Sequence, residues 1–383
     1  MSPDRAAWEN RASTVEAGKP RRVVHVSDQK KRSAAFVEKS GGTAHTRVLK
    51  LQGFYYTKNM EYTDRIYGTF TIDEPVIEEL ILSQPLQRLK DINQYGASFY
   101  RFPHLSTTRF EHSVGVYYIL RRLGATLIEQ IAGLLHDAPH TAFSHVSDIV
   151  FEDASQTFHE KYHAKIIFES EIPQILKKHG LSVWKLLNKS AFGLAERDLP
   201  DLCADRIDYF FRDCVTDKQL DLVDARKILN DMAVYKKDVV FNNEAMAKMF
   251  AVTYRGANEK LWANPLQSAL YYLLASAMKL SLEDGVISFD DIFTTDDEVY
   301  KKMKNSGHKE VVKFLDQMDH VTVEEDATDY DYHITPKIRL VDPYVLIDGT
   351  DKKRLSELDE AIKVSNEEFM KRMEKGYYVK VVK

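Results

Sequence analysis

Cysteine and long apolar runs are scarce in this sequence. Its two cysteines, Cys203 and Cys214, are too few for a disulfide framework, so we expect both to be free thiols in a reducing compartment. No run approaches the roughly 18 to 20 apolar residues of a membrane span, and the N-terminus lacks the apolar centre of a secretory signal. These absences exclude the disulfide-stapled and membrane-spanning classes. They predict an intracellular protein, cytoplasmic or nuclear, that does not associate with membranes.

A strong excess of charge of one sign is also missing. The chain has 53 Lys and Arg against 58 Asp and Glu, which gives a formal net charge of -5. No global positive field therefore concentrates nucleic acid or anionic lipid at the surface, and binding of nucleic acid has no support in the sequence. Any phosphate group must be bound by local side chains.

Apolar residues, by contrast, are plentiful enough for a buried core. They make up 44% of the 383 residues, a length that accommodates one large domain or two ordinary ones. The sequence contains no internal repeat and no low-complexity tract. We therefore expect a globular protein.

The N-terminal residues 1–55 differ from the rest of the chain. They mix Arg, Lys, Ser, Gly and Thr with little apolar periodicity, so we expect a disordered basic tail. Basic residues cluster at 19–22 and again at 30–32, a spacing compatible with a bipartite nuclear signal. A solvated basic tail without a targeting role is the alternative interpretation.

Apolar periodicity divides the remaining residues into two parts. In residues 56–325 apolar side chains recur chiefly at spacings of three and four, which predicts a mainly helical domain. After this domain, strand patterns at 337–341 and 377–382 flank a helical pattern at 354–373. We expect residues 326–383 to form a small α+β appendage.

Ionisable side chains are dense between residues 133 and 148, directly after an apolar helical segment. Three histidines and two carboxylates fall within these sixteen residues: His136, Asp137, His140, His145 and Asp148. Burying a charge or an imidazole costs several kcal/mol unless it is paired or bound to a metal. A shared divalent cation is the simplest explanation, and a set of buried polar residues that satisfy one another is the alternative.

The spacing of these residues limits how they meet an ion. His136 and His140 share one helix face, whereas Asp137 points about 100° away from His136 on an ideal helix. His136 and Asp137 therefore converge on one ion only at a helix end or a distortion, and Pro139 provides such an irregularity.

Two further helical segments carry compatible residues. Upstream, His112 follows Arg109 by three positions at the start of an apolar helix. Downstream, Asp205, Tyr209 and Asp213 lie on one helical stripe. Two imidazoles and two carboxylates would suit a divalent cation such as iron, manganese, zinc or magnesium, and would leave positions for water and a phosphate oxygen.

These ordered motifs resemble the HD-domain phosphohydrolase superfamily. Arg-Phe-Glu-His at 109–112 precedes the His-Asp pair, and Asp-Tyr-Phe-Phe-Arg-Asp at 208–213 follows it. Over residues 64–264 the motifs are most similar to deoxynucleoside triphosphate triphosphohydrolases, including the enzyme that joins a SAM domain to an HD domain, and to related bacterial phosphohydrolases. The resemblance implies a mainly α fold with an all-helical HD-domain core in residues 56–325.

The resemblance also implies roles for single residues. It implies four metal ligands: His112, His136, Asp137 and Asp205. It implies a catalytic histidine with two supporting acid-base residues: His159, His140 and Asp148. Contacts to the phosphates and the sugar are implied for six residues: Gln94, Arg109, His145, Arg206, Tyr209 and Asp213. The implied cofactor is one divalent transition metal, iron, manganese or zinc, with magnesium on the substrate phosphates.

The match departs from the family's pattern around the sugar and the phosphates. Tyr95 follows Gln94 where the triphosphohydrolases carry leucine, and Arg206 stands where they carry lysine. Residues 254–262 only partly resemble the segment that supplies a phosphate-binding arginine and a sugar-stacking tyrosine. We expect Trp262 to take the place of that tyrosine.

Three functions are compatible with this pattern. The resemblance favours hydrolysis of a deoxynucleoside triphosphate to deoxynucleoside and triphosphate, by a protein that we expect to be a homo-oligomer. A phosphomonoesterase or phosphodiesterase acting on another nucleotide is a second enzyme class. A non-catalytic nucleotide or RNA sensor on the same scaffold is the third, and it is disfavoured because the implied ligands and acid-base residues are all present.

Overall fold

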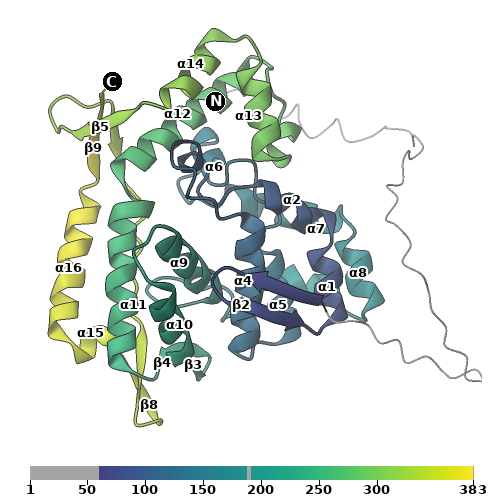
Figure 1. Ribbon diagram of the computed structural model, residues 1–383, viewed down its shortest axis with the longest axis vertical. Helices are drawn as coiled ribbons and strands as arrows, with labels where there is room; N and C mark the ends of the chain where they lie inside the picture. The colour runs from purple at the N-terminus through teal and green to yellow at the C-terminus, as the bar shows by residue number, and fades with distance from the viewer. Residues whose placement is uncertain (1–59, 188–190, 383) are drawn as a thin grey trace, which may run out of the picture. The chain divides into compact units, whose positions relative to one another are not determined.

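The computed structural model describes residues 60–187 and 191–382, which belong to one compact unit (Figure 1). The basic tail expected at residues 1–55 lies outside the described residues, so both of its interpretations remain predictions. Among the helices of the described ranges, none is both long and apolar enough to cross a membrane.

Helices dominate the described structure, which confirms the predicted mainly α fold. The first α-helices are α1 (Pro75–Ile81), α2 (Gln84–Arg88), α3 (Ser98–Arg101), α4 (Arg109–Arg122), α5 (Leu127–Leu135), α6 (Val146–Val150), α7 (His163–Phe168), α8 (Ile172–Lys178) and α9 (Ala204–Thr216). They continue with α10 (Leu222–Asp231), α11 (Glu244–Ala257), α12 (Pro265–Glu283), α13 (Asp296–Lys304), α14 (Lys309–Gln317), α15 (Leu355–Leu358) and α16 (Glu360–Glu374). Short 3-10 helices are η2 (Leu89–Asp91), η3 (Phe158–Tyr162), η4 (Val183–Leu187) and η7 (Asp290–Phe293), and η6 (Asn258–Trp262) is a π-helix.

Helices α4, α5 and α9 form the centre on which the site is built. A capping box starts α4, because the Thr108 side chain accepts a hydrogen bond from the Glu111 amide and Glu111 accepts one from the Thr108 amide. α5 lies close against α4 at Gly133, where an added Cβ would lie 2.2 Å from Leu120 Cδ1. α9 packs on α4 as well, and its Phe210 and Phe211 are fully buried.

Three small sheets accompany the helices. β1 (Met60–Asp64) and β2 (Gly68–Ile72) form an antiparallel hairpin. The second sheet has the order β3-β4-β7-β8, with β4 and β7 parallel, and consists of β3 (Met232–Tyr235), β4 (Asp238–Phe241), β7 (Tyr344–Ile347) and β8 (Asp351–Arg354). The third has the order β5-β9-β6 and consists of β5 (Thr322–Glu325), β9 (Tyr377–Val382) and β6 (Tyr332–Ile334).

The C-terminal residues contribute to the same core as the helical region. β7 and β8 extend the sheet that β3 and β4 begin, and Val341 and Val345 lie in the buried cluster that contains Phe210 of α9. In Figure 1, α16 runs beside α11, and Arg255 of α11 donates a hydrogen bond to Asn366 of α16. A domain boundary near residue 325 stays a prediction.

Two of the three elements predicted after residue 325 are confirmed. The expected strand at 377–382 is β9, and the expected helix at 354–373 is the pair α15 and α16. The strand predicted at 337–341 is wrong, because this segment has no regular secondary structure. Its backbone is held by single contacts instead of a neighbouring strand, such as the 3.2 Å hydrogen bond from the Arg339 amide to Asn258 Oδ1.

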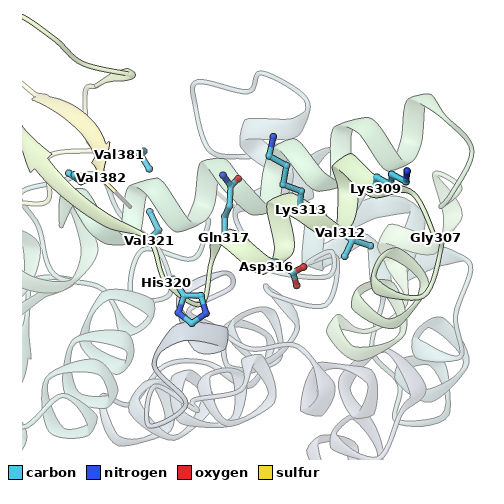
Figure 2. Close-up of a pocket in the computed structure, with 10 residues that line it drawn as sticks. All are labelled: Gly307, Lys309, Val312, Lys313, Asp316, Gln317, His320, Val321, Val381 and Val382. Carbon is cyan, nitrogen blue, oxygen red and sulfur yellow. The ribbon is translucent and has the colours of Figure 1, made fainter.

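A cavity of about 650 Å³ lies between α14 and the end of β9 (Figure 2). Val312 and Val321 contribute to its apolar lining, with Val381 and Val382 of β9, and Lys309 and Lys313 lie along the helix above them. None of its lining residues is among the predicted site residues. This cavity therefore does not mark the candidate active site.

Candidate active site

The four predicted metal ligands come together from three helices. His112 lies on α4, His136 and Asp137 follow the end of α5, and Asp205 lies on α9. Ligand atoms of His112, His136 and Asp137 lie within 4.8 Å of one another. Asp205 Oδ1 lies 3.0 Å from His112 Nε2 and 3.6 Å from His136 Nε2. α5 ends at Leu135, so the adjacent His136 and Asp137 lie in the turn that follows the helix, where the backbone of His136 is still helical (φ -59°, ψ -37°).

The electrostatics of this group are those of two ionised carboxylates beside two imidazoles. Burial alone would raise the pKa of Asp137, but Arg109, His136 and His140 hold it well below its usual range. Burial opposes ionisation of Asp205 too, and His112 and His136 nevertheless hold its pKa far below the usual value. Both carboxylates therefore carry a negative charge at neutral pH.

A divalent cation fits these side chains. Among the described residues, His136 Nε2 has no hydrogen-bond partner although it is buried, and it lies 3.2 Å from Asp137 Oδ1. A buried polar atom without a partner is rare and calls for an ion or a water. A small cavity of about 40 Å³ reaches His136 and Asp205. Imidazole nitrogens and carboxylate oxygens together are the ligand types of iron, manganese and zinc sites.

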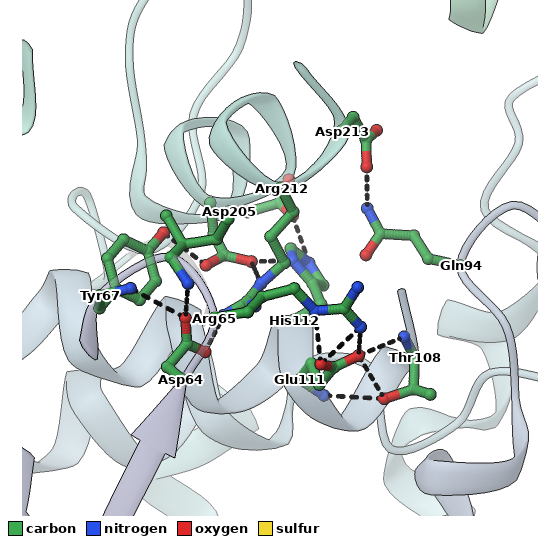
Figure 3. Close-up of polar contacts among 12 residues, drawn as sticks. Asp64, Arg65, Tyr67, Gln94, Thr108, Glu111, His112, Asp205, Arg212 and Asp213 are labelled. Atoms are coloured by element: carbon green, nitrogen blue, oxygen red, sulfur yellow. Dashed lines mark hydrogen bonds and ion pairs between the residues drawn. The ribbon is translucent and has the colours of Figure 1, made fainter. Parts of the chain in front are cut away.

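The orientation of His112 is fixed by a buried ionic network (Figure 3). Its Nδ1 lies 2.7 Å from Asp208 Oδ2, which leaves Nε2 to face Asp205 and Asp137. Asp208 also accepts hydrogen bonds from Arg212 Nε at 2.7 Å and from Tyr67 at 2.6 Å. Arg212 in turn pairs with Asp64 at 2.7 Å. A carboxylate on the far nitrogen of a metal-binding histidine is the usual means of orienting the ring.

Gly115 makes the space for this network. It lies one helical turn after His112, and an added Cβ would lie 1.9 Å from Asp208 Oδ1 and 2.2 Å from Arg212 Nη2. Both neighbours are fully buried and held by charge pairs, so neither can move aside. Glycine is therefore required here for close approach between α4 and α9.

Arg109 opens α4 and acts on the same group from the other side. Its Nη1 donates a 2.9 Å hydrogen bond to Asp137 Oδ2, and its Nε donates one of 2.9 Å to Ser144 Oγ. The side chain is buried. A contact between Arg109 and phosphate, as implied by the resemblance, stays a prediction, and what the described contacts establish is the positioning of Asp137.

The loop between α5 and α6 is strained and held from outside. Phe143 and Ser144 have φ values of 62° and 56°, a left-handed conformation that costs about 1 to 3 kcal/mol per non-glycine residue. The Phe143 amide donates a 2.6 Å hydrogen bond to Asp296 at the start of α13. Burial raises the pKa of that carboxyl to about 7. Arg88 supports the loop from α2, since it donates hydrogen bonds to two of its carbonyl oxygens.

Three further imidazoles gather beside the loop. His140 and His159 stack with ring centroids 3.8 Å apart, and His145 lies 5.1 Å from His140 in an edge-on orientation. Asp148 accepts a 2.7 Å hydrogen bond from His145 and one of 3.0 Å from the amide of Phe158, which begins the 3-10 helix that carries His159. Burial and the neighbouring His140 and His145 lower the pKa of His159 well below its ordinary value. His159 is therefore neutral at pH 7.

Polar and aromatic side chains meet at the other end of α9. Asp213 Oδ2 accepts a 2.7 Å hydrogen bond from Trp262 Nε1, and Gln94 reaches Asp213 Oδ1 at 3.5 Å (Figure 3). Burial raises the pKa of Asp213 to about 6. Gln94 Oε1 is buried and has no hydrogen-bond partner among the described residues. Tyr95 is buried beside this group, where it packs against Leu261.

Other predicted contact residues are engaged with the protein. Arg206 donates hydrogen bonds to the carbonyl oxygens of Asp201 and Arg197. The Tyr209 hydroxyl bonds that of Tyr254. Substrate contacts of Arg206 and Tyr209 therefore stay predictions.

The motif analysis gave no role to several residues that hold the site. Asp208 and Arg212 lie within the motif that follows the His-Asp pair. Asp208 is three residues after Asp205 and Arg212 is four after Asp208, and this spacing is a signal for a charge network on one helix face. Arg88 and Asp296 carry no comparable signal, because they lie far along the chain from the loop that they hold.

Comparison with known proteins agrees with this geometry. A family model described as HD domain matches residues 109–213, from Arg109 to Asp213. The chain is 31% identical to "Metal-dependent phosphohydrolase cns2" of Cordyceps militaris, over 74% of this chain and 84% of that protein. The chain belongs to the HD-domain family of metal-dependent phosphohydrolases. This HD-domain enzyme is 40% identical to "Uncharacterized protein YdhJ" of Bacillus subtilis, over 85% of its own length and all of the relative's.

A third match is partial. The HD-domain enzyme is 35% identical to "Deoxynucleoside triphosphate triphosphohydrolase SAMHD1" of Bos taurus, over 30% of this chain and 22% of that protein. This relative names a substrate, but the match covers only a minor part of either chain. The partial match therefore does not identify the substrate of this HD-domain enzyme.

Proposed function

We propose that the protein hydrolyses deoxynucleoside triphosphates to deoxynucleoside and triphosphate. The observation that carries this proposal is the contact of Gln94 and Trp262 with Asp213, on the helix that also provides Asp205. Asp205 and Asp213 are eight residues apart on α9, which is about 12 Å along its axis. A carboxamide beside a carboxylate suits a sugar hydroxyl, which needs both a donor and an acceptor. One nucleotide can thus reach the ligand group with its phosphate and Asp213 with its sugar.

The metal in this proposal is held by His112, His136, Asp137 and Asp205. A divalent cation lowers the pKa of a bound water and polarises a phosphoryl group. Asp208 and Arg109 keep two of the ligands in place, since they bind the outer atoms of His112 and Asp137. The two carboxylates, ionised as described, supply the charge that the cation requires.

His159 moves the proton in this scheme. Its imidazole is neutral, so it can take up the proton that the attacking water loses and pass it to the leaving oxygen. His140 stacks on it and keeps the ring from turning. Asp148 acts at a distance, because it binds His145 and the amide that begins η3, and so positions the turn from which His159 projects.

A nucleotide panel tests this function. The purified protein is incubated with each common nucleotide and manganese, and the products are resolved by ion-exchange chromatography. We expect triphosphate from deoxynucleoside triphosphates. Release of orthophosphate or pyrophosphate alone, or the absence of turnover by the metal-loaded protein, would contradict the proposal.

A specific observation favours a second candidate, a phosphomonoesterase or phosphodiesterase acting on another nucleotide. Arg255, in the segment where the resemblance implies a phosphate-binding arginine, donates a 2.7 Å hydrogen bond to Asn366 of α16 and points away from the ligand group. Arg206 binds backbone carbonyls. A substrate with one phosphate needs fewer cations. Preferred turnover of nucleoside monophosphates or cyclic nucleotides in the panel would move this candidate to first place.

A further inference from the structure

Most side-chain donors of the HD-motif arginines are already engaged with the protein, although Arg206 Nε is buried without a hydrogen-bond partner among the described residues. Arg109 binds Asp137 and Ser144, and Arg212 is fully buried between Asp208 and Asp64. Arg206 donates to backbone carbonyls, as described above. A triphosphate carries several negative charges and is bound in proteins by arginine and lysine side chains. Other cations are therefore needed near the ligand group.

The segment of residues 335–343 brings two cations to this place. Ile338 and Leu340 pack against the cluster of Ala263, Phe369 and Met373, whereas Val341 is buried in the cluster that contains the apolar face of α9. Along the chain Lys337 and Arg339 alternate with Ile338 and Leu340. They lie an even number of positions before Val341. In an extended chain, side chains of the same parity point to the same side. Lys337 and Arg339 therefore face α9 and the site.

Electrostatic contacts support this orientation. Partial desolvation and the charges of Arg339 and Arg206 lower the pKa of Lys337, and the charges of Asp205 and Asp148 act in the opposite direction. Lys337 is exposed, and it is within electrostatic reach of Asp205 in the ligand group and of Asp148 in the acid-base group. Burial lowers the pKa of His145, and the charge of Arg339 contributes to that shift. The charges of both side chains thus act on groups of the site.

Neither cation has a counter-ion. Among the described residues, the side chains of Lys337 and Arg339 make no hydrogen bond and no ion pair, and the contact of Arg339 with Asn258 uses its backbone amide. This hydrogen bond ties the segment to the π-helix that carries Trp262. Two unpaired cations held side by side repel one another, and an anion bound between them removes that repulsion.

We propose that Lys337 and Arg339 bind the polyphosphate of the substrate, as a cationic arm that the C-terminal segment supplies to the HD-domain site. The identity of the substrate rests on the proposed function, but the binding of a polyphosphate does not. The arm would bind the phosphates in place of Arg255, whose side chain is bound to Asn366. Residues outside the HD-domain match at 109–213 are then required for affinity.

The test measures binding of inorganic tripolyphosphate to the protein without any turnover. Wild type, Lys337→Gln, Arg339→Gln and the double variant are loaded with manganese, freed of excess metal and titrated in a calorimeter. We expect the double variant to bind about 10- to 100-fold more weakly, the range for losing hydrogen bonds to charged groups. Lys337→Arg keeps the charge and should bind within a few-fold of wild type.

Lys353→Gln is the matched control, because Lys353 is an exposed lysine of β8 in the same C-terminal region. Metal content and the midpoint of thermal unfolding are measured for every protein, and both should stay at the wild-type value. The two substituted side chains make no described hydrogen bond, so folding should persist. Titration with orthophosphate, which spans fewer cations, should show weaker binding in wild type.

The outcomes separate this proposal from the proposed function. Equal tripolyphosphate affinity in wild type and in the double variant overturns the cationic arm, whatever the substrate. A wild type that does not bind tripolyphosphate overturns it as well. If the double variant loses affinity while the nucleotide panel yields no triphosphate, the arm stands and the proposed substrate falls.

Discussion

The two halves of the site are held in different ways. On the α4 and α9 side, His112 is fixed by Asp208, and Asp208 by Arg212, in a chain of buried charges with distances of 2.7 Å. On the side of the loop after α5, imidazoles stack on one another, and His140 Nδ1 is buried without a hydrogen-bond partner among the described residues. In the first half both nitrogens of His112 and both oxygens of Asp208 are engaged, although Arg212 Nη1 has no partner among the described residues, whereas in the second half His140 keeps a nitrogen uncommitted.

The difference matches two kinds of chemistry. A metal ligand must keep one geometry, and buried ion pairs on rigid helices provide it at a cost of desolvation. A group that takes up and releases a proton must not be locked in one protonation state, so it needs weaker contacts. The proposed ligands and the proposed acid-base residues are thus separated by how firmly the protein binds them.

The largest effect is expected in the ligand half. Replacing His136 and Asp137 together by Ala removes two of four proposed ligands and one of two carboxylate charges, so bound metal and hydrolysis should both be lost. Elemental analysis and the nucleotide panel measure this. The control is the pair His104 and Asp217, which lies outside the ligand group, and its replacement by Ala should change neither quantity. Full metal occupancy in the His136 and Asp137 variant would show that the ligand assignment is wrong.

The proton-transfer half should respond differently. His159→Ala should leave the metal in place and slow turnover by about 10² to 10⁴, the usual contribution of a positioned acid or base. Turnover at saturating substrate and metal content are measured side by side. His179→Ala serves as the control, since His179 contacts Glu79 outside the site. An unchanged turnover rate would show that His159 takes no part in the reaction. It would also contradict the proposal that one half of the site binds the metal and the other transfers the proton.

The next effect tests whether the ion pairs position the metal or only stabilise the fold. Asp208→Ala leaves Arg212 with one partner and frees His112, so the free energy of unfolding should fall by about 3 to 5 kcal/mol and metal affinity by about 10- to 100-fold. Asp64→Ala is the matched control, because Asp64 pairs with Arg212 but does not touch His112. Urea unfolding and metal titration compare the two.

Equal loss of metal affinity in Asp208→Ala and Asp64→Ala would contradict a positioning role for Asp208. The ion pairs would then contribute to stability alone. A larger loss in Asp208→Ala, at similar stability, is the expected result.

The same contrast explains what could be predicted from the sequence. His112, His136, Asp137 and Asp205 belong to short motifs with helical spacing, so the sequence indicated that they belong together, and the helix end that His136 and Asp137 need was expected as well. The mainly α fold followed from apolar spacing in the same way. Asp208, although in the motif, was given no role because its function depends on α4 lying against α9.

Contacts between distant segments could not be predicted. The support of the loop by Arg88 and Asp296 joins residues about 50 to 150 positions apart, and no local pattern records it. Residues 337–341 carry the alternation of a strand, but a single hydrogen bond from the Arg339 amide to Asn258, and one from the following Asp342 amide to the Pro200 carbonyl, replace a neighbouring strand. The alternation nevertheless had a cause, since Ile338 and Leu340 pack against one buried cluster and Val341 is buried in another.

The smallest effect is expected on sugar selectivity. It concerns the end of α9 near Asp213, which belongs to neither half of the site. Tyr95 is buried beside Gln94, packs against Leu105 and Leu261, and stands where the resemblance implies leucine. Its bulk should crowd a ribose 2′-hydroxyl, so the ratio of kcat/KM for dATP over ATP should exceed one in wild type. Tyr95→Leu should lower that ratio by about tenfold, the lower end of the scale for small volume changes in an apolar pocket. Tyr95→Phe removes only the hydroxyl, which interacts with the carboxyl of Asp213, and should leave the ratio unchanged because the volume of the ring is kept. A wild-type ratio at or below one would contradict the proposal that the substrate is a deoxynucleotide. If Tyr95→Phe lowered the ratio as much as Tyr95→Leu, the selectivity would depend on the hydroxyl of Tyr95 and not on its volume.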